Sequence, residues 1–139
     1  MLSNLIGTIA VMACLSISKQ VASPDFNLIC YEVMAEAGGD GAQSIEACAT
    51  VILNRVESPR FPDTVREVIE APGAFCDPSG YYTAEVERYV YRAVIRHGTD
   101  HQIVPYNCYY FRAGNYHSFG IPYTHYGNTY FSLSEEASL

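Results

Sequence analysis

Two glutamates, Glu32 and Glu36, are the residues of this sequence best placed for acid–base chemistry. A spacing of four residues puts both carboxyls on one face of a helix. Glu36 would fall in the last turn, where unpaired backbone carbonyls carry partial negative charge, so the helix end and Glu32 both favour a protonated Glu36 carboxyl. A protonated carboxyl can donate a proton to the leaving oxygen of a glycosidic bond. Glu36 is therefore our candidate catalytic acid.

Glycines directly after this helix add to the case without deciding it. Gly38 and Gly39 carry no side chains, so a polymer substrate could approach the backbone beside Glu36 closely. A glutamate before two glycines is, however, usually only a solvated helix end. The residues alone leave both interpretations open.

Histidines and a cysteine suggest a zinc site as a rival chemistry. His97 and His101 are four residues apart and Cys108 follows, which resembles the spacing of zinc ligands. Gly98 should end the helix between the two histidines, so their imidazoles would not share a face. We therefore expect neither a metal nor a cofactor.

A cysteine–histidine hydrolase is a second rival. Such an enzyme would pair Cys76 or Cys108 with His117 or His125, because the two side chains need only lie close together in space. No local sequence signature supports this pairing, so it ranks below Glu36.

Two helices are expected to position Glu36. The first should span residues 24–37, with Ser23 as the N-cap and Pro24 at the first helical position. Gly38 and Gly39 should supply the left-handed residue that ends it. Asp40 should then cap a core helix that runs to about residue 56 and carries one apolar stripe.

Two further helices and two strands complete the expected fold. Thr64 should cap a short helix over 65–69, and Thr83 should open an amphipathic helix that ends before Gly98. Beyond residue 99 aromatic residues accumulate, and segments 107–114 and 128–133 have the composition of short strands. We predict a predominantly helical α+β domain with a small C-terminal β element.

Length and charge limit the possible functions. The chain has 139 residues, enough for one domain with a single site. Its net charge of −7 argues against nucleic acid as a partner, because no basic stripe is present to neutralise phosphates. We expect a monomer.

The N-terminal segment indicates export. An apolar run over residues 5–17 is followed by Lys19 and small residues, which is typical of a signal peptide, although an uncleaved anchor would have the same pattern. We divide the chain into a leader over 1–23, a catalytic domain over 24–133 and a tail over 134–139. The protein is expected to be secreted or attached to the cell envelope.

Removal of this leader leaves four cysteines: Cys30, Cys48, Cys76 and Cys108. An even number suits disulfides in an oxidising compartment. The helical positions of Cys30 and Cys48 suit buried small side chains equally well. The sequence leaves both possibilities open.

The motifs around Glu36 resemble the SleB/CwlJ family of cell wall hydrolases, the spore-cortex-lytic type. That family has Glu-Ala-any-Gly-Glu, an apolar helix ending in Val-Ile-Leu-Asn-Arg-Val, Ser-Pro and Phe-Pro pairs, and Gly-any-Phe. The matching positions here are Glu36, Ala37, Gly39, Asp40, residues 51–56, Ser58, Pro59, Phe61, Pro62, Gly73 and Phe75. With the aromatic strands near the C-terminus, the resemblance covers roughly residues 26–133.

This resemblance implies a lysozyme-like, lytic-transglycosylase-like fold and Glu36 as the catalytic acid and base. The implied substrate is peptidoglycan, cut between N-acetylmuramic acid and N-acetylglucosamine. The implied chemistry is lytic transglycosylation, which forms 1,6-anhydromuramyl ends, with muramidase hydrolysis as the variant. The alternative is a noncatalytic glycan-binding module of the same fold.

Departures from the family pattern bear on the site. Asp40 stands where the family has a second Glu, and Thr129 stands where it often has His. A helix cap is the favoured role for Asp40. We nevertheless include it among the candidate substrate-binding residues, which are Asp40, Asn54, Phe75, Tyr110, His117 and Tyr126. For Asn54 we favour a structural role, with its amide bonded to loop backbone.

Overall fold

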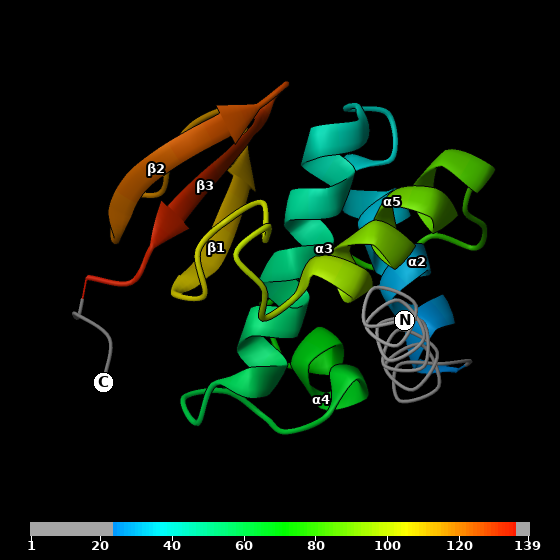
Figure 1. Ribbon diagram of the computed structural model, residues 1–139, viewed down its shortest axis with the longest axis horizontal. Coiled ribbons are helices and arrows are strands. Elements are labelled where there is room, and N and C mark those ends of the chain that lie inside the picture. Colours follow the sequence, from blue (N-terminus) through cyan, green and yellow to red (C-terminus); the bar gives the residue numbers. More distant parts are fainter. Residues whose placement is uncertain (1–23, 136–139) are drawn as a thin grey trace, which may run out of the picture.

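The computed structural model describes residues 24–135, which form four helices followed by a three-stranded sheet (Figure 1). This confirms the expected α+β class. The elements are α2 (Asp25–Ala37), α3 (Ala42–Glu57), α4 (Val65–Glu70), α5 (Ala84–Arg96), β1 (Cys108–Ala113), β2 (Ile121–Tyr126) and β3 (Thr129–Leu133). Within residues 24–135, no helix combines the length and the apolar character needed to cross a membrane.

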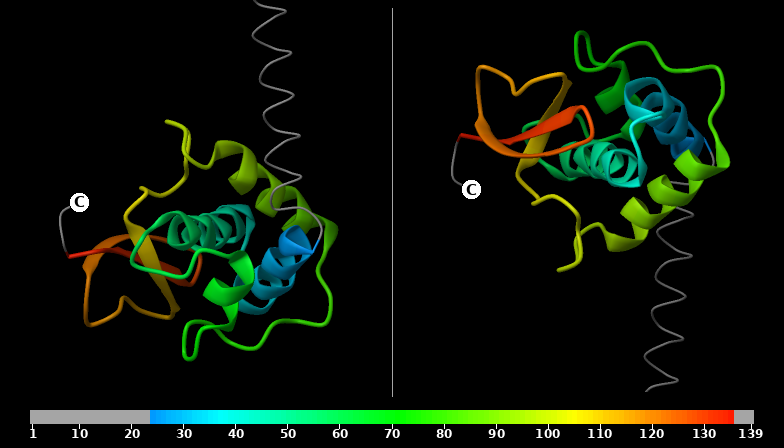
Figure 2. Two further views of the ribbon diagram at one scale, coloured as in Figure 1. Left: turned by 90° about the horizontal axis from the view of Figure 1, so that it is seen from below. Right: turned by 90° about the horizontal axis from the view of Figure 1, so that it is seen from above.

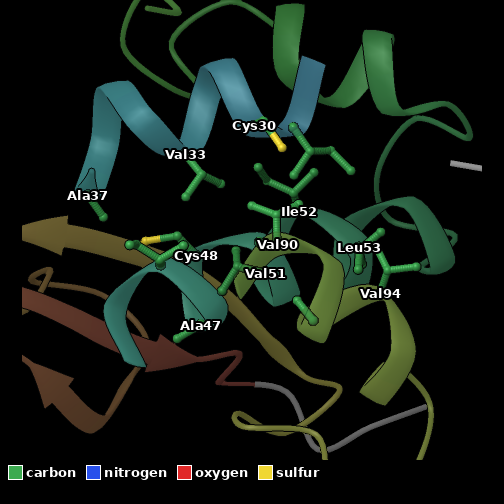
Figure 3. Packing of buried hydrophobic residues seen from close by; sticks show 14 of the residues in the cluster. Cys30, Val33, Ala37, Ala47, Cys48, Val51, Ile52, Leu53, Val90 and Val94 are labelled. Atoms are coloured by element: carbon green, nitrogen blue, oxygen red, sulfur yellow. The ribbon is translucent and has the colours of Figure 1, made fainter. Parts of the chain in front are cut away.

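Helix α3 is the centre of the domain. It packs against α2, α4, α5 and β1, and every residue from 44 to 54 is buried. Figure 2 shows the sheet on one side of α3 and the helices α2 and α5 on the other. In the core, Val33 of α2, Ile52 of α3 and Val90 of α5 are each 0 % exposed (Figure 3). Burial of each such side chain contributes about 1.5–3 kcal/mol, so this core fixes the frame that holds Glu36.

The sheet has the strand order β1-β3-β2, and both pairs are antiparallel. Two of these strands match the predicted segments to within a residue, but β2 was missed, because we took its residues for a loop. All six residues of β2 are exposed or half-buried, so its sequence lacks the alternation that marks a strand with one buried face. Pro122 is tolerated because β2 lies at an edge of the sheet.

The helix ends agree only partly with the sequence signals. Thr64 and Thr83 cap α4 and α5 with their side chains, as predicted. Pro24 takes the N-cap position of α2 rather than the first helical position, and Ser23 lies outside the described residues.

The prediction that a left-handed glycine ends α2 was wrong. Gly38 has a φ of −59°, and it is Gly41, four residues after α2 ends, that adopts a positive φ of 97°. Gly38 is needed for space instead, since a Cβ there would lie 2.6 Å from the carbonyl oxygen of Met34. Gly38 thus lets the chain turn tightly at the end of α2.

The four cysteines of the described region are all free thiols. Cys30, Cys48 and Cys108 are buried and Cys76 is exposed. The structure therefore supports the interpretation of Cys30, Cys48 and Cys108 as buried small side chains and not as members of disulfides.

The proposed leader, residues 1–23, lies outside the described part of the chain. Two residues that we assigned to the tail are held by the domain. The backbone N–H of Ser134 donates to the carbonyl of Asn107 at 3.0 Å, and a carboxylate oxygen of Glu135 accepts from the N–H of Gly120 at 3.0 Å. The ordered domain therefore continues past residue 133.

Candidate active site

Glu36 lies in the last turn of α2 and is half-buried. Its Oε1 accepts a hydrogen bond of 2.8 Å from the backbone N–H of Cys76, which belongs to the long segment between α4 and α5. This bond fixes the orientation of the carboxyl. A half-buried, oriented carboxyl is what general acid catalysis requires.

Glu32 lies one helical turn before Glu36 and is fully buried. Its Oε2 lies 3.9 Å from the Sγ of Cys76, and its Oε1 has no hydrogen-bond partner among the described residues. The pKa of Glu32 is raised from 4.5 to about 7, chiefly by burial and also by the negative charges of Glu36 and Asp77, while the hydrogen bond from Cys76 acts in the opposite direction. The neighbouring carboxyls of Glu36 and Glu32 therefore lie in different environments. That of Glu36 is accessible to a substrate, and that of Glu32 is buried in the protein.

Asp40 connects the α2–α3 loop to the β2–β3 turn. Its carboxylate oxygens accept from the backbone N–H of Asn128 at 2.9 and 3.0 Å, and Oδ2 also accepts from the hydroxyl of Thr129 at 2.6 Å. The hydroxyl of Thr129 in turn accepts from Ser44 at 2.9 Å. The predicted helix cap was therefore wrong, since Gly41 is the N-cap of α3 and no side chain caps it.

The charge of Asp40 suits this role. Burial by itself would raise the pKa of Asp40, but hydrogen bonds from Thr129, Asn128 and Ser44 outweigh it and lower the pKa. The turn comes close enough to Asp40 that Gly127, with a φ of +55°, has no room for a Cβ. Asp40 thus holds the C-terminal hairpin against the end of α2.

Arg55 organises the aromatic wall beside Glu36. The carbon Cζ of its guanidinium lies 4.8 Å from the ring centre of Phe75, 4.9 Å from that of Phe61 and 5.9 Å from that of Tyr110. Its Nε donates to the carbonyl of Tyr109 at 2.8 Å. Desolvation lowers the pKa of Arg55, yet an arginine remains charged, so the contacts with the ring faces are cation–π contacts. Arg55 thereby fixes the ring of Phe75, the residue before Cys76 in the chain.

Tyr110 and His117 belong to a second aromatic group with Phe119. The rings of His117 and Phe119 stack at 4.5 Å, and Tyr110 meets Phe119 edge-on at 5.0 Å. His117 Nε2 lies 3.1 Å from the carbonyl oxygen of Phe111. In the sheet Tyr110 pairs with Ser132, three residues along β3 from the Asp40 contact. At about 3.4 Å per residue this places Tyr110 on the order of 10 Å from that end of the strand.

The remaining candidates have different surroundings. Tyr126 is half-buried, packs 5.8 Å from the ring of Phe131 and pairs with Thr129, so it lies near Asp40. Asn54 is 3 % exposed, and its Nδ2 donates to the carbonyls of Pro105 and Cys108 at 2.9 and 3.0 Å. Gln102 donates to the Asn54 Oδ1 at 3.0 Å. All polar groups of the Asn54 side chain are hydrogen-bonded inside the protein, so we assign Asn54 the structural role.

A cavity of about 740 Å³ has Asn54 in its lining but none of the other candidate residues. It lies between the start of α2, the end of α3 and the loop after α5, and it is lined in part by Asp25, Glu57, Asp63 and His97. None of Glu32, Glu36 and Cys76 lines it. The candidate acid therefore does not open into this cavity.

The described residues do not support the two rival sites, the zinc site at His97 and His101 and the cysteine–histidine hydrolase. Among residues 24–135, the group of side chains close enough to share a metal ion is Glu32, Glu36 and Cys76, and it contains neither His97 nor His101. The pKa of the Cys108 thiol is raised to about 12, chiefly by burial. The pKa of the Cys76 thiol is also raised to about 12, by desolvation and by the neighbouring carboxyls of Glu36 and Glu32. Neither thiol would be ionised near neutral pH, which argues against a cysteine nucleophile.

Sequence reasoning missed two features of this site. The contact of Cys76 with both glutamates joins residues separated by 40 and 44 positions, and no local pattern signals it. Arg55 was noted only as part of a motif. An arginine at the end of a buried helix, with phenylalanines and tyrosines in the following loops, was a signal that could have predicted the aromatic wall.

Comparisons with known proteins agree with this architecture. A family described as Cell Wall Hydrolase matches residues 39–132, a span that begins three residues after Glu36. Spore cortex-lytic enzymes of Oceanobacillus iheyensis and Bacillus subtilis are 47 % and 45 % identical to the chain over 51 residues. These alignments cover 37 % of this chain and only 18 % and 17 % of the relatives.

Solved structures show the same fold. The catalytic domain of the Bacillus cereus SleB protein matches with a TM-score of 0.61 and 24 % identity, over 78 % of this chain and 88 % of that domain. The catalytic domain of the germination-specific lytic transglycosylase SleB from Bacillus anthracis matches with a TM-score of 0.62 and 24 % identity, over 80 % of this chain and 96 % of that domain. The expected fold class is thus confirmed.

Proposed function

The chain belongs to the Cell Wall Hydrolase family, and from this premise we propose that it cleaves the glycan strands of peptidoglycan with Glu36 as the catalytic acid. The observation that carries the assignment of Glu36 is its geometry. Its carboxyl is half-buried and is oriented by the N–H of Cys76 at 2.8 Å, and Cys76 directly follows Phe75 in the chain. An acid, a positioning donor and a ring that can pack on a sugar are thereby combined on one surface.

The bond to be cut lies between N-acetylmuramic acid and N-acetylglucosamine. In the proposed reaction Glu36 protonates the leaving oxygen as the bond from that oxygen to the muramyl anomeric carbon breaks. The carboxylate so formed then accepts the proton of the muramyl C6 hydroxyl, whose oxygen bonds to the anomeric carbon. A 1,6-anhydro ring closes, no water is consumed, and Glu36 ends in its initial protonated form.

The environment of Glu32 supports this chemistry with a single acid. Many glycosidases use a second carboxylate, which must reach the anomeric carbon or a water beside it. Glu32 is close to Glu36 but 0 % exposed, so it cannot reach a sugar. An attacking group supplied by the substrate itself removes the need for a second carboxylate.

Two aromatic groups and Asp40 would contribute to substrate binding. The first group surrounds Arg55 and contains Phe75, and the second contains His117 and Phe119. Tyr110 contacts both groups, and Tyr126 lies near Asp40. A glycan strand is long enough to touch both groups at once. The substrate lies in the cell wall, so we propose that the enzyme works outside the cytoplasm, as the predicted leader would require.

Digestion of purified peptidoglycan tests the proposal. The full chain should release fragments with 1,6-anhydromuramyl ends, which mass spectrometry distinguishes from reducing ends because they are lighter by one water. Reducing ends would show hydrolysis instead of transglycosylation. Release of no fragments, with retained binding to the sacculi, would favour the glycan-binding module.

Glu36→Gln should reduce fragment release by at least 10²-fold, because the amide cannot donate the proton. Its urea unfolding midpoint should stay close to that of the parent chain. Glu70→Gln is the matched control, since Glu70 is an exposed residue of α4 paired only with Arg66. An active Glu36→Gln enzyme would contradict the site assignment.

A further inference from the structure

Glu32, Glu36 and Cys76 bring three metal-ligating atoms together. One carboxylate oxygen of each glutamate and the Sγ of Cys76 all lie within 4.8 Å of one another. The glutamates come from successive turns of α2, and the backbone of Cys76 is itself bonded to Glu36. The three side chains are therefore held together by a helix and a loop that is fixed to it.

A second, independent observation concerns Glu32. Its side chain is 0 % exposed, and its Oε1 has no partner among the described residues. A buried oxygen without a hydrogen bond is rare, because burial removes its hydrogen bonds to water without replacing them. The other oxygen of this carboxyl, Oε2, lies 3.9 Å from Cys76 Sγ, so a cation held by both oxygens would give Oε1 the partner that the described residues do not provide.

We propose that Glu32, Glu36 and Cys76 form a binding site for a thiol-seeking divalent cation, represented by Zn²⁺, and that its occupation blocks Glu36. The ligand set decides the class of ion. Zn²⁺ accepts thiolate and carboxylate ligands in a tetrahedral arrangement, with water at the open position. Mg²⁺ prefers an octahedron of oxygens and has little affinity for sulfur.

Binding exchanges protons for the ion. The cation bonds to the Cys76 sulfur and to carboxylate oxygens, and the thiol proton, with any carboxyl proton present, passes to solvent. A carboxylate bound to Zn²⁺ cannot donate a proton to a glycosidic oxygen. The ion is thus an inhibitor and not a cofactor.

Metal binding can be measured without any substrate. Co²⁺ is the probe, because a cobalt ion bound to a thiolate has an intense charge-transfer absorption in the near ultraviolet. The full chain should bind one Co²⁺ with this absorption, and Zn²⁺ should abolish it while Mg²⁺ should not. Cys76→Ser should lose the band, and Glu32→Gln should weaken Co²⁺ binding at least tenfold.

Cys14→Ser is the matched control, since Cys14 is the cysteine of the sequence outside the described residues, and this variant should keep the band. Urea unfolding of each variant verifies that it is folded. Absence of the band from the parent chain, or its survival in Cys76→Ser, would overturn the proposal. Unchanged Co²⁺ affinity in Glu32→Gln would overturn the role of Glu32.

Inhibition is a separate measurement that rests on the proposed function. Zn²⁺ should suppress fragment release from peptidoglycan, and Cys76→Ser should require at least tenfold more Zn²⁺ for the same fractional loss of its own activity. A parent chain that binds Co²⁺ but never releases fragments would contradict the proposed function and leave the metal site standing. A chain that binds Zn²⁺ and stays fully active would refute the block of Glu36.

Discussion

At the scale of single residues, the site depends on the contrast between Glu36 and Glu32. Both belong to the same face of α2, but Glu36 reaches the surface and Glu32 does not. The spacing of the two residues was visible in the sequence. The burial of Glu32 was not, because it depends on the segment containing Cys76, which reaches α2 from a distant part of the chain.

The buried Glu32 should make stability depend on pH. Its pKa is raised from 4.5 to about 7 in the folded protein. Between these values the unfolded chain loses the proton while the folded protein keeps it, so the free energy of unfolding should fall as pH rises, by at most about 3 kcal/mol. Below pH 4.5 both states are protonated and the contribution is complete.

Urea unfolding at a series of pH values checks this prediction. Glu32→Gln removes the titrating group, so the difference in unfolding free energy between parent and variant should change across this pH window. The other titrating groups are common to both proteins and cancel in that difference. A difference that stays constant from pH 4.5 to 7 would show that Glu32 titrates normally.

At the scale of elements, the contact of Asp40 with Thr129 joins the α2–α3 loop to the sheet. Replacement of Asp40 by Asn removes the charge, and replacement of Thr129 by Val removes the donor with little change of shape. Each variant should lose about 1–3 kcal/mol of stability, because hydrogen bonds to a charged group are the stronger kind.

A double-mutant cycle isolates this contact. The stability losses of the single variants Asp40→Asn and Thr129→Val should add up to more than the loss of the double variant. The difference, measured by urea unfolding, is the coupling energy and should be about 1 kcal/mol. Additive losses would mean that the two side chains do not cooperate. Both single variants should also release fragments more slowly, because the hairpin beside Glu36 is no longer fixed.

Sequence patterns predicted elements better than they predicted contacts. The helices were recognisable because caps such as Thr64 and Thr83 act within a few residues. Strand β2 was missed because neither of its faces is buried. The role of Asp40 was missed because its partners lie 88 and 89 positions away, and a local cap was the better explanation at short range.

At the scale of the whole molecule, the core is held by packing rather than by crosslinks. Cys30, Cys48 and Cys108 are buried among apolar side chains as free thiols. The urea unfolding midpoint should therefore be the same with and without a reducing agent, whereas one native disulfide would contribute about 2–4 kcal/mol. Alkylation of the unfolded, unreduced chain should modify all three thiols, and a crosslinked pair of peptides in the digest would contradict this.

The hydrogen bond between Asp40 and Thr129 also determines when, during synthesis of the chain, the region around Glu36 can be completed. A chain is synthesised from its N-terminus, so α2 with Glu36 is complete long before the turn that fixes the neighbouring loop. The last strand of the domain, β3, begins with Thr129 itself. A nascent or truncated chain that carries Glu36 but stops short of β3 lacks the Thr129 contact that holds this loop, so the end of the domain around Glu36 is complete only when the sheet closes.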